Sequence, residues 1–229
     1  KANGFEGLDT ELSFNSKNHA KHLDRLLALS KDGAFKYSGR DNAPDPLFLS
    51  GKVGIQFNSS AARGDIVKNA QFKWGMAMLP FDPEIAKTPL NSIIGGASLW
   101  TMTAPNRTAA EYKAVATFLA FIAKPENDAY WHQHTGYVCV TNAGYEQTKK
   151  DGYYDKNPYV DLPVRQLARG TLTPNSKGLR LGRLVEIRNI VYEEVEKAFQ
   201  GGQTGQQALD NAVQRGNKVL RDFQKALKA

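Results

Sequence analysis

The residues of this chain whose types suit them to chemistry are few, and most of them stand next to expected turns. Ser59 lies where a predicted strand gives way to a helix, and its hydroxyl can donate or accept a hydrogen bond. Gly96, in the run Gly95-Gly96-Ala97, has a bare amide that can donate to an anion. The Tyr137 ring can pack on a carbon skeleton, and the Arg188 guanidinium can bind phosphate or carboxylate oxygens through two parallel hydrogen bonds. These residue types together predict a polar, basic cradle for an anion.

Each of these residues also has a structural interpretation, which the sequence leaves open. Serines at a strand-to-helix junction commonly cap the helix, and the adjacent Ser60 is as well placed for ligand contact as Ser59. A glycine pair in an apolar run is typical of a bulge at the end of a strand. A tyrosine such as Tyr137 is often half-buried at a strand end, and an exposed arginine on a helix, such as Arg188, is common.

Catalytic and metal-binding patterns are missing from the sequence. It contains no G-x-S-x-G elbow, P-loop, dinucleotide-binding fingerprint or H-E-x-x-H pattern. His19 and His22 share a predicted helix face, but the sequence places no third metal ligand beside them. His132 and His134 are expected at the surface or between layers. We therefore predict neither an enzyme nor a bound metal or cofactor.

Composition sets wider limits. With 229 residues, 41% of them hydrophobic, the chain can bury a sizeable core, and no apolar run is long enough to cross a bilayer. Cys139 is the single cysteine, so an intrachain disulfide is impossible and the redox compartment stays open. The chain starts at Lys1 without a methionine or a leader, and we expect it to be a processed product or an excised piece.

The net charge of +7 would suit an anionic partner, but the basic residues are spread along the chain. The densest group of lysines and arginines lies near the C-terminus on a predicted helix that also carries Asp210 and Asp222. A solvated helix face is the ordinary interpretation of such a group, which includes Arg215, Lys218, Arg221 and Lys225.

The predicted elements change in kind along the chain. The first part has alternating apolar and polar residues, which predict strands at 52–58, 73–79 and 93–102, and a shorter strand follows at 137–140. Helical spacing of apolar residues predicts helices at about 17–31, 60–69, 112–123, 125–134, 142–150, 157–167, 184–200 and 205–227. This order of elements favours an α/β fold.

Several longer runs resemble a known family over almost the whole chain. They are similar to the extracytoplasmic solute-binding proteins of ABC importers, and most closely to the glycerol-phosphate branch of that family. The telling runs are Phe72–Pro80, Ile94–Trp100, Phe118–Asn127, Trp131–Tyr137 and Lys177–Gly182, with a weaker similarity at Phe48–Gly51.

The resemblance implies the periplasmic-binding-protein fold, in which two α/β lobes joined by a hinge close on a ligand. It implies that residues 1–101 belong to the second lobe and end at the hinge. Residues 102–162 would form a mostly helical return to the first lobe, and residues 163–229 a helical part of the second. Members of the family carry another first half, so we expect this chain to be the later part of such a protein.

The implied function is that of a periplasmic receptor for glycerol 3-phosphate, and for glycerophosphodiesters such as glycerophosphocholine. Such a receptor is a monomer that delivers its ligand to the membrane permease subunits. Carried over by motif, Ser59, Gly96 and Tyr137 would contact the ligand, and Arg188 would bind its phosphate. The missing first half would be needed for the full site.

Two other functions stay open from the residues. A receptor of the same kind could bind a neutral sugar or oligosaccharide, with aromatic stacking in place of the anion cradle. A basic nucleic-acid-binding module would instead require a one-sided basic face and would show steep salt dependence.

Overall fold

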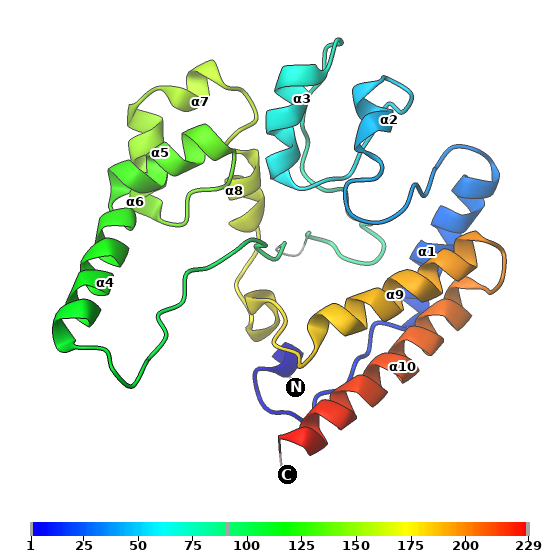
Figure 1. Ribbon diagram of the computed structural model, residues 1–229. Helices are drawn as coiled ribbons and strands as arrows, with labels where there is room; N and C mark the ends of the chain where they lie inside the picture. Colours follow the sequence, from blue (N-terminus) through cyan, green and yellow to red (C-terminus); the bar gives the residue numbers. More distant parts are fainter. Residues whose placement is uncertain (1, 90–91, 228–229) are drawn as a thin grey trace. The chain divides into compact units, whose positions relative to one another are not determined.

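The computed structural model describes residues 2–89 and 92–227. The chain divides into two compact units. The two ends of the chain, up to Asp45 and from Leu172 on, form the terminal unit, and the stretch from Pro46 to Thr171 forms the central unit. Helices are the regular elements of both units (Figure 1).

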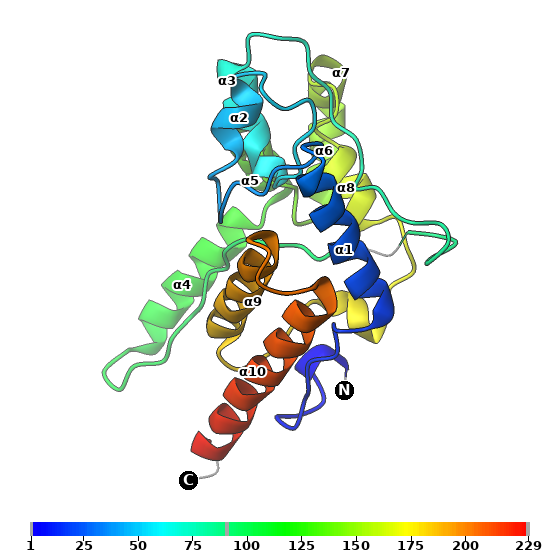
Figure 2. The same cartoon turned by 90° about the vertical axis from the view of Figure 1, so that its right-hand side faces the viewer.

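The terminal unit is built on α1 (Lys17–Lys31), α9 (Leu184–Phe199) and α10 (Gly205–Ala226), with the short 3-10 turns η1 (Ala2–Gly4) and η3 (Pro174–Lys177). Helices α9 and α10 lie side by side as an antiparallel hairpin, and α1 packs against them (Figures 1 and 2). Thr204 caps α10 in the predicted capping box, because its hydroxyl accepts from the Gln207 amide at 3.2 Å and the Gln207 side chain accepts from the Thr204 amide at 2.9 Å.

Two apolar clusters fill the space between these three helices. One joins α1 to the adjoining ends of α9 and α10, and the other joins the opposite part of the α9–α10 hairpin to the N-terminal segment. Gly216 allows the close approach of this segment, since a Cβ there would lie 2.4 Å from the Leu12 side chain. The buried apolar residues are Ala20, Leu23, Ala198, Ala208 and Leu209 in the first cluster, and Ile187, Ile190, Ala212, Val219 and Leu220 in the second.

The central unit contains shorter helices. They are α2 (Asp45–Leu49), η2 (Ser60–Ala62), α3 (Arg63–Asn69), α4 (Ala109–Ile122), α5 (Pro125–Thr135), α6 (Asn142–Lys150), α7 (Tyr153–Lys156) and α8 (Leu162–Leu167). The best-packed pair is α5 with α6. Pro125 starts α5 and Gly136, with a φ of 78°, ends it in the left-handed conformation, as the sequence predicts.

The four predicted strands are not formed within residues 2–89 and 92–227. Residues 52–58, 73–79, 93–102 and 137–140 have no strand assignment, and a strand exists only where a neighbouring segment completes its hydrogen bonds. Apolar side chains on these segments lie open to solvent: Ile55 is 78% exposed, Leu99 66% and Trp100 85%. The alternating pattern at these segments is thus not accompanied by strand pairing among the described residues.

Among the described helices, none combines the length and the apolar character that a bilayer crossing requires.

Candidate functional site

Ser59 stands at the start of η2, and its backbone has the extended φ and ψ of an N-cap residue. Its hydroxyl accepts a hydrogen bond from the Ala61 amide at 3.3 Å, so the capping interpretation is confirmed for this serine. Ser59 is exposed and its hydroxyl proton remains able to donate to a ligand. Ser60 is half-buried inside the turn itself, which favours Ser59 as the accessible residue of the pair.

Gly96 lies in an exposed, irregular stretch of the central unit. Its φ of 143° lies in the region that favours glycine, and a Cβ added there would meet no atom within 4 Å. Ile93, Ile94 and Leu99 on either side are more than half exposed. Backbone conformation thus favours glycine at Gly96, whereas neither conformation nor a packed neighbour in the described residues explains Gly95.

Tyr137 follows the end of α5 and is 48% exposed. His132 fixes its position, because the His132 Nδ1 hydrogen-bonds to the Tyr137 carbonyl. Only 1% of His132 is exposed, so of the two expected positions, at the surface or between layers, the surface is wrong. The aromatic rings of Tyr153 and Tyr154 pack around this histidine, with centroids 6.1 and 5.7 Å from its own.

The segment after Tyr137 is held by the buried carboxylate of Asp128 on α5. Its oxygens accept from the Val140 amide at 3.1 Å, the Thr141 amide at 3.0 Å and the Thr141 hydroxyl at 2.7 Å. Gly144 makes room for it, since a Cβ there would lie 2.3 Å from the carboxylate. Asp128 was missed in the sequence, where a single aspartate in a helix gives no signal of burial.

Arg188 lies in the second turn of α9 in the terminal unit, whereas the other three candidates belong to the central unit. Its side chain is exposed, and its Nη2 donates to the Tyr192 hydroxyl at 2.9 Å. This hydrogen bond raises the pKa of Arg188 above its ordinary value, so the side chain is positively charged at every pH of interest. No carboxylate of the described residues forms an ion pair with Arg188.

Within the described residues, no hydrogen bond or ring contact joins Ser59, Gly96 and Tyr137 to one another. Ser59, Gly96 and Tyr137 therefore lie on turns and irregular segments of the central unit and are not in mutual contact there, and Arg188 lies on a helix of the terminal unit. Their role in ligand binding stays a prediction. Tyr192 was also missed, although its place four residues after Arg188 on a helix was a usable signal.

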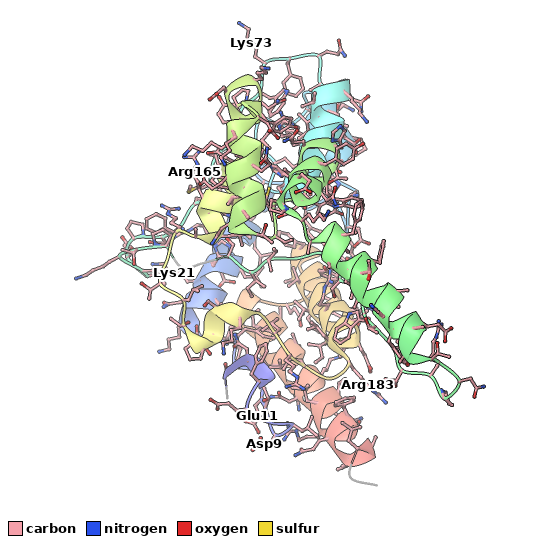
Figure 3. The ribbon with its side chains drawn as sticks, turned by 90° about the vertical axis from the view of Figure 1, so that its left-hand side faces the viewer. Asp9, Glu11, Lys21, Lys73, Arg165 and Arg183 are labelled. Atoms are coloured by element: carbon pink, nitrogen blue, oxygen red, sulfur yellow. The ribbon has the colours of Figure 1, made fainter. Side chains whose placement is uncertain are left out.

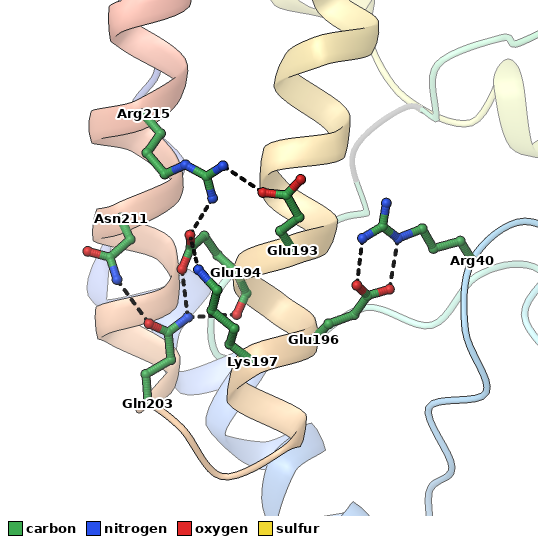
Figure 4. Close-up of polar contacts among 8 residues, drawn as sticks. All are labelled: Arg40, Glu193, Glu194, Glu196, Lys197, Gln203, Asn211 and Arg215. Carbon is green, nitrogen blue, oxygen red and sulfur yellow. Dashed lines mark hydrogen bonds and ion pairs between the residues drawn. The ribbon is translucent and has the colours of Figure 1, made fainter.

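The basic residues near the C-terminus are partly structural. Arg215 bridges α10 to α9 through Glu193 at 2.6 Å and Glu194 at 2.5 Å (Figure 4). Arg221 donates to the carbonyl of Thr10 at 2.5 Å. These two arginines are half-buried and make tertiary contacts, so the expected solvated face does not describe them fully.

Charges of both signs occupy the surface of each unit. Figure 3 labels several of these exposed side chains: Asp9, Glu11, Lys21 and Arg183 on the terminal unit, and Lys73 and Arg165 on the central unit. Arg165 is paired with Asp161 at 2.8 Å, and Arg183 with Glu186 at 3.6 Å. Mixed charges of this kind differ from the one-sided basic face of a nucleic-acid-binding module.

Comparison with known proteins adds sequence relatives. The family described as bacterial extracellular solute-binding protein matches residues 6–158. The sn-glycerol-3-phosphate-binding periplasmic protein UgpB of Pectobacterium atrosepticum is 46% identical over 228 residues, and that of Salmonella typhimurium is 46% identical over 229. The alignments cover 100% of this chain but 51% and 52% of those proteins, so the chain spans about half the length of the relatives it matches.

A solved structure gives the fold. The cyclic α-maltosyl-1,6-maltose binding protein of Arthrobacter globiformis matches with a TM-score of 0.71 and 22% sequence identity. The match covers 93% of this chain and 50% of that one. The family match and this likeness confirm the fold expected from the sequence, in its partial form. The chain belongs to the family of bacterial extracellular solute-binding proteins.

Proposed function

We propose that this chain is the ligand-binding part of an ABC-importer receptor for glycerol 3-phosphate. The observation that carries the proposal is the 44–46% identity, over the whole chain, to proteins named for binding glycerol 3-phosphate in the periplasm. The receptor works in the periplasm, performs no catalysis, and delivers its ligand as a monomer to membrane permease subunits. Glycerophosphodiesters are a second class of ligand that such a site can accept.

Arg188 is the residue proposed to bind the phosphate. A phosphate ester needs a charged donor that no protein carboxylate already neutralises, and Arg188 meets this requirement among the described residues. Ser59, Gly96 and Tyr137 would add a hydroxyl, an open amide and an aromatic ring, which suit the glycerol moiety and the remaining phosphate oxygens. Ligand bound in this way would shift the equilibrium of the two lobes toward a closed state by its greater affinity for that state.

The complete receptor requires a second stretch of polypeptide, equivalent to the half of the relatives that this chain does not span. Two segments of the central unit, 52–58 and 93–102, support this proposal. Most of their large apolar side chains are exposed, and their backbones pair with no neighbouring strand among the described residues. Strand addition from the other half would bury these apolar side chains and pair these backbones. The division into lobe segments 1–101, 102–162 and 163–229 belongs to the same proposal.

Fluorescence tests the need for the other half. The unaligned part of the Pectobacterium atrosepticum relative, produced as a separate polypeptide, is added to this chain, and Trp100 emission is followed against a Trp100→Phe control. A blue shift that the control lacks is expected, because Trp100 is 85% exposed in the structure and would become buried. Unchanged emission together with an absence of binding between the two polypeptides would contradict strand addition.

Calorimetry tests the function. Glycerol 3-phosphate, glycerophosphocholine and maltose are titrated into this chain joined to that same part of the relative. Binding of phosphate esters alone is the expected result, and the preferred ester names the ligand. Binding of maltose alone would favour the neutral-sugar function, to which the structural likeness to a cyclic maltosyl-maltose binding protein also points.

A further inference from the structure

We propose that Tyr192 is a positioning residue that orients the Arg188 guanidinium for a phosphate ester. The proposal rests on the proposed function, which places Arg188 on the phosphate. It concerns only the terminal unit, whose helix α9 carries both residues.

The two side chains are joined by a hydrogen bond and by a contact between the guanidinium and the aromatic ring. Tyr192 lies one helical turn after Arg188, and its hydroxyl accepts from the Arg188 Nη2 at 2.9 Å. The Arg188 guanidinium carbon also lies 5.8 Å from the centroid of the Tyr192 ring. A neutral hydroxyl fixes the direction of the guanidinium without neutralising it, whereas a carboxylate would compete with the ligand phosphate for the same donors.

Tyr192 also contacts a second arginine, Arg40. The Arg40 guanidinium carbon lies 5.4 Å from the centroid of the Tyr192 ring. Glu196, a further turn along α9, accepts from the Arg40 Nε at 2.8 Å and from its Nη2 at 2.6 Å (Figure 4). Arg40 is thus a cation with its own counter-charge, fixed in place against the ring.

The two arginines that contact Tyr192 therefore differ in whether a carboxylate neutralises their charge. Arg40 is neutralised by Glu196, while Arg188 uses one of its five N–H donors on the tyrosine hydroxyl. Asp41 attracts Arg188 through space, but it forms no ion pair with it. This asymmetry identifies Arg188 as the phosphate-binding cation and Arg40 as structural support for Tyr192.

A double-mutant cycle separates positioning from a general structural role. Affinities for glycerol 3-phosphate are measured by calorimetry for the joined protein and its Tyr192→Phe, Arg188→Ala and doubly substituted forms. Tyr192→Phe keeps the ring and removes one hydrogen bond, so we expect affinity to fall about 3- to 10-fold. In the Arg188→Ala background the same change is expected to have no effect, because the group that Tyr192 orients is gone.

A matched control and a ligand-free measurement complete the design. Tyr112→Phe removes a tyrosine hydroxyl that accepts from the Ala104 amide at 3.0 Å in the central unit, and it should leave affinity unchanged. In the 229-residue chain without ligand, NMR relaxation of the Arg188 Nε–H group should show lower order in Tyr192→Phe than in the parent or in Tyr112→Phe.

The outcomes keep the two proposals apart. If Arg188→Ala weakens binding and Tyr192→Phe does not, the function stands and the positioning role is wrong. If Tyr192→Phe weakens binding equally in both backgrounds, Tyr192 does not act through Arg188, and the proposal is again overturned. If no phosphate ester binds to any form, the proposed function fails, and the order of the Arg188 Nε–H group decides the positioning role.

Discussion

The terminal unit of this protein buries a larger set of apolar side chains than the central unit does. Ten of the twelve buried apolar residues of the described chain belong to the terminal unit, and only Ala129 and Val160 belong to the central one. Several large apolar side chains of the central unit are more than half exposed: Ile55, Phe57, Ile93, Ile94, Leu99, Trp100 and Met102. Helices satisfy their own backbone and need only one packed face, whereas strands depend on neighbours for every hydrogen bond.

The largest expected effect is in the core of the terminal unit. Leu220→Ala removes a side chain that is 4% exposed, and the cavity should lower the free energy of unfolding by about 2–5 kcal/mol. Leu99→Ala makes the same change in the central unit at a residue that is 66% exposed, and should alter it by less than about 0.5 kcal/mol. Urea unfolding followed by circular dichroism measures both. Equal losses would contradict the difference between the units.

The buried carboxylate of Asp128 tests whether the helical part of the central unit has a polar core of its own. Asp128→Ala leaves two backbone amides and the Thr141 hydroxyl without their acceptor, and should cost about 2–4 kcal/mol. Glu146→Ala, an exposed substitution on α6, is the control. Hydrogen exchange at Val140 and Thr141 should accelerate in the first variant alone, and unchanged protection there would rule out Asp128 as the anchor.

Acid should destabilise the terminal unit through Glu194. Burial alone would raise the pKa of this carboxyl, but hydrogen bonds from Lys197, Gln203 and Arg215 outweigh it and lower the pKa to about 2. Because the folded pKa is depressed, the stabilisation is present above the unfolded value of roughly 4.5 and is lost as pH falls toward 2.

Unfolding measured between pH 6 and pH 2.5 should therefore show a loss on the order of 2–3 kcal/mol that involves Glu194. The variant Glu194→Gln should have lower stability at pH 6 and a flatter dependence on pH. A slope identical to that of the parent protein would contradict the role given to this carboxyl.

The smallest expected effect concerns a cap. Thr204→Ala removes one half of the capping box of α10 and should cost about 1 kcal/mol of unfolding free energy. Thr204→Ser, which keeps the hydroxyl, should cost much less. Thr108 caps α4 of the central unit in the same way, and Thr108→Ala should bring a loss of similar size if capping is local in both units. A large loss at one helix only would show that its cap also supports tertiary contacts.

The helices were predictable because their signals are local. Pro125 and Gly136 mark the ends of α5, and Thr204 with Gln207 marks the start of α10. Strand pairing depends on residues distant in the chain, so the alternation around Ile55 and Phe57 predicted a strand with a buried apolar face, whereas both side chains are exposed and no strand is formed there.

For the candidate site, residue types and resemblance gave Ser59, Gly96, Tyr137 and Arg188 as candidates. The residues that hold these candidates and their segments in place were not predictable, since each depends on a tertiary contact or on a side-chain direction. Asp128 binds the Thr141 segment across 13 residues, and Arg40 reaches Glu196 across 156. Helical spacing alone places Tyr192 next to Arg188, but spacing does not tell a hydroxyl acceptor from an ordinary half-buried tyrosine.

The most direct test of the central claim is the affinity of the Arg188→Ala variant for glycerol 3-phosphate, in the chain joined to the part of the Pectobacterium atrosepticum relative that it does not span. A charge-assisted hydrogen bond to phosphate predicts a loss of roughly 10- to 150-fold, with the melting temperature unchanged because Arg188 is exposed. Arg183→Ala, which removes an exposed arginine five residues earlier, should keep the parent affinity. Parent-like affinity in Arg188→Ala would contradict the assignment of the phosphate to this residue.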